Sequence, residues 1–176
     1  MLVFGCKGDD NSKSDDLEKK QSRPNVLLIS IDTLRQDHVS AYGYHRKTTP
    51  NLDKLASDAT LFTNAVSTSN WTLPAHMSMM TGLPTSAHRC EDDTDRLPEQ
   101  LIILPQVMKK SGYKTAGFVS HVYVDGKYGF AKGYDTYVNN PDQSAEMVSN
   151  QAIRWLEGAD EGPFFLFAHY FDPHWG

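Results

Sequence analysis

The sequence contains few cysteines, no long apolar stretch and no cluster of basic residues, and each absence narrows the possible functions. Its 2 cysteines, Cys6 and Cys90, form no C-x-x-C pair of the kind that holds structural zinc. No apolar run approaches the roughly 20 residues that a transmembrane helix needs. Lys and Arg number 17 against 22 Asp and Glu, which gives a formal net charge of −5. Without a basic face, no nucleic-acid partner is expected.

The composition that remains is that of a folded domain. Hydrophobic residues make up 39% of the 176 residues and charged residues 22%, as in ordinary globular domains. Residues 7–20 are dominated by Gly, Asp, Asn, Ser, Lys and Glu, and such a segment cannot bury a core. We therefore expect residues 1–22 to be a polar tether and the domain to occupy residues 23–176.

The first six residues, Met-Leu-Val-Phe-Gly-Cys, resemble the end of a bacterial lipoprotein signal. In such signals the cysteine is lipidated and becomes the mature N-terminus. The basic region and the longer apolar stretch of a full signal are missing, so the start has been trimmed or miscalled, or the likeness is chance. The resemblance implies membrane attachment through lipidated Cys6 and a place in the bacterial cell envelope, as a periplasmic or outer-membrane lipoprotein.

Hydrophobic patterning predicts strands that alternate with helices. Unbroken apolar runs predict buried strands at residues 25–31, 114–120 and 163–170, with a further extended segment at about 61–66. Helical spacing, prolines near a first position and closing glycines predict helices from residue 50 to about 59 and at 74–81, 105–111 and 141–157. Residues 85–98 are predicted to be a polar surface loop. The order indicates an α/β fold with a mainly parallel sheet, flanked by helices on both faces.

Polar residues follow the predicted strands, and ligands of open parallel sheets bind beyond the carboxyl ends of strands. These residues are Asp32 and Thr33, then 68–72, then Ser120 and His121, then Asp172 and His174. The pattern predicts one site assembled from four strand ends.

Asp32 has two possible roles at this stage. A carboxylate at the end of a buried strand is costly unless it is solvated, paired or bound to a cation, and it suits a hard or borderline divalent metal. The pair Asp32-Thr33 also favours capping of a helix or turn. Both interpretations stay open.

Thr72 and His76 lie at the start of the predicted helix 74–81. Thr72 fits either an N-cap or a nucleophile placed where helix N–H groups attract an anion, and its hydroxyl then needs a metal or a base to activate it. Single histidines such as His76, His121 and His169 are more often packed or surface residues than ligands. His174 differs, because the run 171–174 places an acid and an imidazole at one strand exit.

Five stretches, in order, resemble the sulfatase family of the alkaline-phosphatase superfamily. They are RPNVLLISIDTLRQDHVSAYGY (23–44), TTPNLDKLASDATLFTNAVS (48–67), TLPAHMSMMTGLPTSAH (72–88), GYKTAGFVS (112–120) and PFFLFAHYFDPH (163–174). The resemblance implies an alkaline-phosphatase-like α/β fold, of which this chain is the N-terminal part and which is incomplete at the C-terminus. It also implies a hydrolase acting on the sulfuric esters of a small molecule or glycan, through a covalent intermediate on residue 72.

The same resemblance assigns roles to individual residues. Asp32 and Thr33 would hold a divalent cation, which is Ca if the protein is a sulfatase and Mn or Zn if it is a phosphotransferase. Thr72 would be the nucleophile, and His76 and His174 would complete the catalytic set, with His174 binding or protonating the ester. The family's remaining metal ligands lie downstream of residue 176, so this chain alone is expected to be inactive, and to aggregate or stay partly unfolded.

The sequence departs from the sulfatase pattern at the nucleophile. Typical sulfatases carry Cys or Ser followed by x-Pro-x-Arg and oxidise the Cys or Ser to formylglycine, whereas residues 72–76 are Thr-Leu-Pro-Ala-His. Threonine would give a ketone and not an aldehyde. Related phosphodiesterases and phosphoryl-group transferases use a metal-activated threonine, and this is the alternative function. A third reading is a non-catalytic envelope lipoprotein that serves as a binding module.

Overall fold

The computed structural model describes residues 23–159 and 162–174. The predicted tether and Cys6 lie outside this part of the chain. The elements are β1 (Val26–Ile31), α1 (Pro50–Ser57), α2 (Thr72–Thr81), α3 (Thr85–His88), α4 (Leu104–Lys110), β2 (Lys114–Val119), β3 (Thr136–Asn139), α5 (Ala145–Glu157) and β4 (Phe164–Tyr170), with short 3-10 turns between them. None of the described helices is long and apolar enough to cross a membrane.

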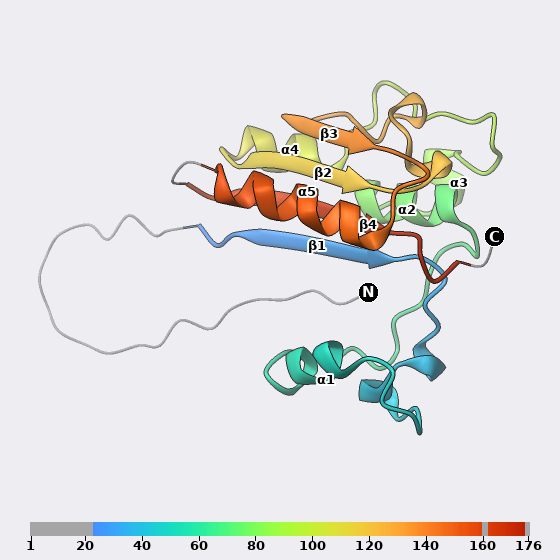
Figure 1. Cartoon of the computed structure of the whole chain (residues 1–176). Helices are drawn as coiled ribbons and strands as arrows, with labels where there is room; N and C mark the ends of the chain where they lie inside the picture. Colours follow the sequence, from blue (N-terminus) through green and yellow to red (C-terminus); the bar gives the residue numbers. More distant parts are fainter. Residues whose placement is uncertain (1–22, 160–161, 175–176) are drawn as a thin grey trace, which may run out of the picture.

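The strands form one parallel sheet in the order β1-β4-β2-β3 (Figure 1). β4 comes last in the sequence but lies between β1 and β2, with Ser30 opposite His169 on one side and Val119 opposite His169 on the other. The parallel α/β architecture predicted from the alternating pattern is confirmed.

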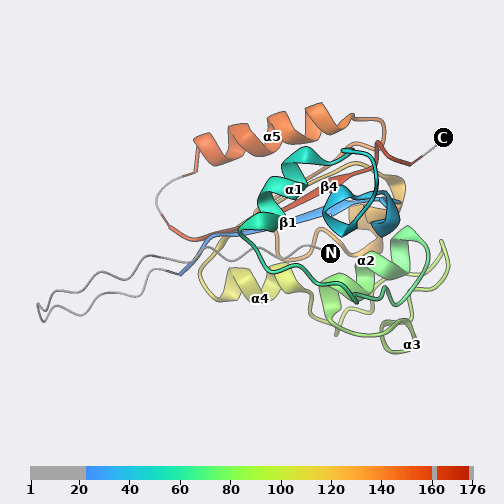
Figure 2. The same cartoon turned by 90° about the horizontal axis from the view of Figure 1, so that it is seen from below.

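Both faces of β4 are buried, which explains its continuous apolar sequence. Phe165 and Phe167 point to one face, where they pack with Leu73 and Met77 of α2. The alternate residues, among them Leu166, point to the opposite face, where α5 packs through Val148 and Ala152. Figure 2 shows α5 on one side of the sheet and α2 and α4 on the other. Each buried ring or Leu side chain stabilises the fold by about 1.5–3 kcal/mol relative to an exposed one.

The helix that carries the predicted nucleophile begins two residues earlier than expected. Pro74 is its third residue, a position whose N–H would have no intrahelical partner in any case. The residue before the helix is Trp71, so Thr72 is not the N-cap and that interpretation of Thr72 is wrong. Gly82 ends the helix in the left-handed conformation, at φ 69°, as the sequence predicts.

Three other expectations need correction. Residues 61–66 do not join the sheet, and the side chains of Phe62 and Val66 are exposed, Val66 by 91%. β3 takes the fourth place instead. The segment 85–98 is not a simple surface loop, because it contains α3 and the fully buried side chains of His88 and Cys90. α5 begins at Ala145 and not at residue 141, because the Ser144 side chain caps it.

Candidate active site

The carboxyl end of β1 and the first turn of α2 meet at Asp32 and Thr72. Asp32 follows β1 directly, and its N–H donates to the carbonyl of Tyr170 at the end of β4, at 2.9 Å. The Thr72 hydroxyl donates to Asp32 Oδ2 at 2.9 Å. Two residues 40 positions apart are thus in direct contact, and Thr72 is 8% exposed. The structure therefore brings together the predicted nucleophile and the predicted metal-binding carboxylate.

Asp32 is held as a carboxylate. Burial raises its pKa, but the neighbouring His169 ring and the Thr72 hydroxyl stabilise the charged form more, and the pKa falls to about 2. An ionised carboxylate of this kind is a good ligand for a cation and a weak base. It orients the Thr72 hydroxyl more than it activates it.

His76 ties α2 to β1. Its Nδ1 lies 2.8 Å from the Thr72 carbonyl oxygen, which only accepts, so Nδ1 carries the proton. Nε2 is then the acceptor for the Ser30 hydroxyl, also at 2.8 Å. Burial lowers the pKa of His76 to about 4, and the nearby His169 ring adds to this effect. The structure places the predicted catalytic His76 against the backbone of Thr72, where it fixes the first turn of α2.

His169 is a site residue that the sequence alone does not identify. It lies inside β4 and is fully buried, with Nδ1 3.0 Å from the Ser120 carbonyl and Nε2 3.4 Å from Asp32 Oδ2. The signal in the sequence is a histidine near the end of an otherwise apolar strand, where a polar side chain needs a partner.

Thr33, the other predicted metal ligand, adopts a left-handed backbone conformation with φ 55°. This conformation is a genuine outlier for a β-branched residue and costs about 1–3 kcal/mol. The strain lies at the residue after Asp32, where the chain turns away from β1. The metal-binding role of Thr33 stays a prediction.

His174, the third predicted catalytic residue, lies in the turn after β4 and is exposed. Its ring stacks on Phe171 at 4.4 Å, and Phe171 stacks in turn on His121 at 4.0 Å. The Asp172 carboxylate accepts the Ala145 N–H at 2.8 Å and so caps the start of α5. The pairing of this acid with the His174 imidazole stays a prediction.

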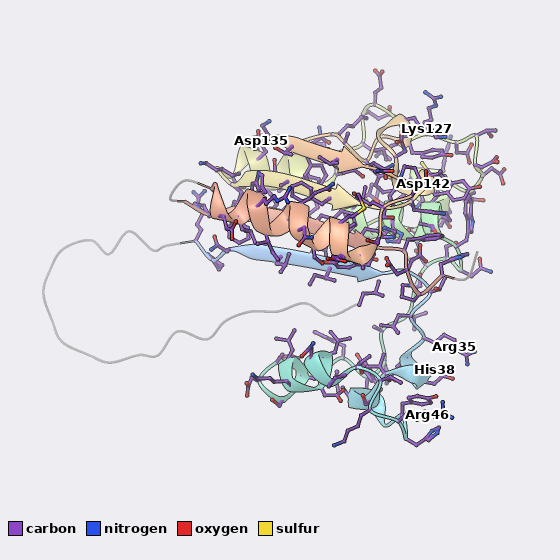
Figure 3. The ribbon with its side chains drawn as sticks, viewed as in Figure 1. Arg35, His38, Arg46, Lys127, Asp135 and Asp142 are labelled. Carbon is purple, nitrogen blue, oxygen red and sulfur yellow. The ribbon has the colours of Figure 1, made fainter. Side chains whose placement is uncertain are left out.

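A cavity of about 660 Å³ opens beside Thr72 and Asp32. Its far wall comes from residues 33–62, a lobe that contains α1 and lies apart from the sheet beside β1 (Figure 1). The wall includes the apolar side chains of Leu55 and Phe62. Arg35, His38 and Arg46 lie on the same lobe (Figure 3). The volume is in the range of small-molecule sites.

The described residues include side chains that could donate to a divalent cation. Within residues 23–159 and 162–174, no group of three or more His, Cys, Asp or Glu side chains is arranged to hold a metal ion. Asp32 offers a carboxylate, Thr72 a hydroxyl, and His169 a buried ring nitrogen, Nε2, that has no hydrogen-bond partner. These are donors that divalent cations accept, so the residues present fit a cation site that further ligands would complete.

Comparison with known proteins identifies the family. The family model described as Sulfatase matches residues 24–176, which is most of the chain. The chain belongs to the sulfatase family. A sulfatase of Formosa agariphila is 25% identical over 221 aligned residues, which cover 99% of this chain and 43% of that protein.

Solved structures show the same fold. A protein in complex with its substrate D-glucosamine-2-N,6-O-disulfate superposes with a TM-score of 0.79 at 20% identity, covering 87% of this chain and 35% of that chain. The phosphonate monoester hydrolase of Agrobacterium radiobacter gives a TM-score of 0.74 at 23% identity, covering 86% and 41%. The chain thus spans less than half the length of these relatives. The alkaline-phosphatase-like α/β fold expected from the sequence is confirmed.

Proposed function

We propose that this sulfatase-family chain carries the nucleophile and part of the cation site of a hydrolase of sulfuric esters, with a small-molecule or glycan sulfate ester as substrate. The observation that carries the proposal is the 2.9 Å contact between the Thr72 hydroxyl and Asp32 at the carboxyl end of β1. The disulfated glucosamine named as substrate of a structural neighbour supports the sulfated-sugar class.

The residues support a direct attack by Thr72. Asp32 and His76 hold the hydroxyl and the backbone of residue 72 in one place, and free N–H groups of the first turn of α2 favour an anionic ester there. A bound divalent cation would supply the activation of the hydroxyl that a carboxylate with a pKa of about 2 does not. As the hydroxyl releases its proton to solvent, an S–Oγ1 bond forms and the S–O bond of the ester breaks, which leaves the sulfate on Thr72 and the alcohol as the leaving group.

The leaving alcohol then needs a proton, and water must later cleave the ester formed on Thr72. His174, at the exit of β4, is the residue we propose for protonation of the leaving group. Oxidation of Thr72 would convert its hydroxyl to a ketone and not to the aldehyde of formylglycine. The proposed reaction therefore uses the unmodified threonine. We propose Ca for a sulfatase reaction and Mn or Zn for phosphoryl transfer, with Thr33 as a further ligand beside Asp32.

A second candidate is a phosphodiesterase or phosphoryl-group transferase that uses the same Thr72. A threonine hydroxyl at this position favours it, and the phosphonate monoester hydrolase shows that the fold also serves phosphorus chemistry. A non-catalytic envelope module is the third candidate. Location in the envelope and lipidation of Cys6 are proposals that rest on the first six residues alone.

The test is an assay of the purified full-length gene product, with each divalent cation, against an aryl sulfate and an aryl phosphodiester. Thr72→Ala is expected to lower kcat/KM by roughly 10³-fold or more, because no nucleophile remains. Thr72→Ser is expected to keep part of the activity. Thr85→Ala is the matched control, since Thr85 also opens a helix but lies outside the Asp32 contacts.

The substrate that is turned over decides between the two enzymes. Turnover of the phosphodiester alone overturns the sulfuric-ester proposal. If Thr72→Ala and the wild type have equal activity, and circular dichroism shows unchanged folding, both enzyme proposals are rejected. The non-catalytic binding module is then the remaining candidate.

A further inference from the structure

The ring of His169 has one nitrogen with a clear partner and one without. Nδ1 lies 3.0 Å from the Ser120 carbonyl oxygen, and a carbonyl oxygen only accepts, so Nδ1–H is the donor. In the neutral ring, Nε2 therefore presents a lone pair. That atom is buried and has no hydrogen-bond partner, and an unsatisfied buried polar atom costs about 1–3 kcal/mol.

The atom that faces this lone pair is negatively charged. Asp32 Oδ2 lies 3.4 Å from His169 Nε2, which is longer than the 2.7–3.2 Å of an ordinary N–H···O bond. A lone pair and a carboxylate oxygen repel each other unless a proton or a metal ion lies between them, and at 3.4 Å the two atoms are farther apart than a shared proton holds them. Two ligands of a tetrahedral ion with bonds of about 2.1 Å lie roughly 3.4 Å apart. The spacing is that of two ligands on one ion.

We propose that His169 Nε2 is a direct ligand of the cation that Asp32 and Thr72 hold, and that this nitrogen makes the site selective for Zn²⁺ over Ca²⁺. The inference rests on the proposed function only for the presence of a cation, and it favours the phosphoryl-transfer candidate, for which Mn or Zn is proposed, over the sulfatase reaction with Ca. Ca²⁺ binds oxygen ligands almost exclusively, whereas imidazole nitrogen suits Zn²⁺ and other transition metals.

The surroundings of His169 are those of a positioned metal ligand. A ligating histidine commonly donates its other N–H to a backbone carbonyl, which fixes the tautomer and the ring. The acceptor is itself held in place, because the Ser120 hydroxyl donates to the Gln143 carbonyl at 2.8 Å and the Gln143 amide donates to the Val119 carbonyl at 2.8 Å. All of these side chains are buried.

The neighbouring His76 does not offer the same role. Its ring lies 4.8 Å from that of His169, centroid to centroid, but both of its nitrogens have partners, the Thr72 carbonyl and the Ser30 hydroxyl. The two buried rings are thus chemically distinct, one satisfied by the protein and one not. The distinction assigns the metal to His169.

The test measures metal binding and does not depend on activity. Competition with a chromophoric chelator gives the Zn²⁺ dissociation constant of the whole protein, and a Ca²⁺ titration gives the second affinity. His169→Gln is expected to weaken Zn²⁺ binding by roughly 100-fold or more and Ca²⁺ binding by less than about threefold. His88→Gln is the matched control, a fully buried histidine whose two nitrogens contact Ser78 and Cys90, and it is expected to keep both affinities.

Three outcomes overturn the inference. The first is unchanged Zn²⁺ affinity in His169→Gln, and the second is the absence of Zn²⁺ binding by the wild type. The third is an equal loss of Zn²⁺ and Ca²⁺ affinity in His169→Gln, which would mark His169 as only a partner of Asp32. If His169→Gln does not fold, the imidazole ¹⁵N spectrum of the wild-type protein replaces it. The Nε2 resonance of His169 is expected to shift on addition of Zn²⁺, and an unmoved resonance rejects direct ligation. A failed ester assay with intact Zn²⁺ binding would reject the proposed reaction and leave the ligand assignment standing.

Discussion

Ser78 and His88 show how hydrogen-bond direction separates a structural pair from a catalytic one. The Cys90 N–H donates to His88 Nδ1 at 3.1 Å, so the ring proton of neutral His88 is on Nε2, which faces the Ser78 hydroxyl at 2.9 Å. A general base needs a lone pair directed at the hydroxyl, and here the proton occupies that place. The pair therefore holds α2 against the end of α3 and does not activate Ser78.

The thiol of Cys90 is expected to be unreactive in the folded protein. Cys90 is fully buried, and burial raises its pKa to about 11, so almost no thiolate forms at pH 8. Iodoacetamide at pH 8 should leave the Cys90 peptide unmodified in the native protein and alkylate it in urea. Peptide mapping by mass spectrometry separates Cys90 from Cys6. Rapid native labelling of the Cys90 peptide would contradict the burial of this segment.

His76 is expected to make the protein less stable in mild acid. Its pKa falls from 6.5 in the unfolded chain to about 4 in the fold, so the unfolded state binds the proton more tightly. This contribution to stability is complete above pH 6.5 and is lost as the pH falls towards 4, by an amount on the order of 3 kcal/mol. Urea denaturation of the wild type and His76→Gln from pH 7.5 to 4 measures it. Equal slopes for the two proteins would show that His76 is not the cause.

At the scale of the elements, the sequence predicts what local patterns encode. β1, β2 and β4 are recognisable because a strand buried on both faces is apolar throughout, and α2 ends at Gly82 as expected. The four-residue strand β3 has only partly buried residues and carries no such pattern. Residues 61–66 have the apolar, β-branched composition of a strand, but no strand lies beside them for pairing. Pairing is a tertiary property that composition does not contain.

The site was predictable to a similar extent. Strand exits place Asp32 next to β1 and His174 after β4, and the structure brings Asp32 and Thr72 into contact. The role of His169 was not visible, because its isolated Nε2 depends on the carbonyl of Ser120, 49 positions away in the sequence. Sequence patterns show which residues end a strand and not which lone pair faces a carboxylate.

The start of α5 is expected to depend on Asp172. Its carboxylate accepts the Ala145 N–H at 2.8 Å, while the Ser144 side chain accepts from Met147 at 3.4 Å. Asp172→Ala is expected to lower the free energy of unfolding by about 1 kcal/mol, because an N-terminal N–H of the helix loses its acceptor. The control is Asp142→Ala, an exposed aspartate near the same end of the sheet (Figure 3), for which thermal melts should show little change. Equal effects of the two substitutions would argue against the cap.

Gly133 is expected to tolerate no side chain. Its φ is +80°, and a Cβ atom there would lie 2.4 Å from the backbone nitrogen of Gln106 in α4. Gly133→Ala should therefore destabilise the protein by about 3 kcal/mol or more, from backbone strain and a clash that backbone atoms cannot relieve. Gly43→Ala separates the two causes, since Gly43 has φ +95° but open space around it. It should cost only about 1 kcal/mol in denaturant titrations.

At the scale of the whole molecule, the candidate site lies between two walls, one formed by the sheet and its helices and the other by a separate lobe. The sheet side is rigid, because both faces of β4 are packed against helices. The opposite wall is the lobe of residues 33–62, which encloses the cavity of about 660 Å³ and places apolar side chains opposite Thr72. The residues of the proposed chemistry thus lie on the sheet side, and the lobe is the side expected to contact a substrate.

Because β4 lies between β1 and β2, the sheet cannot form until β4 has been synthesised. Asn25 beside β1 bonds the backbone of Phe164 across 139 positions of sequence, so the sheet is closed by contacts of very long range, which slow folding. On the ribosome, β1 and β2 emerge long before the strand that joins them. Until residues 164–170 have left the exit tunnel, the two halves have no common partner and His169 is not beside Asp32. A nascent chain therefore depends on β4 for its core and for the contact between His169 and Asp32.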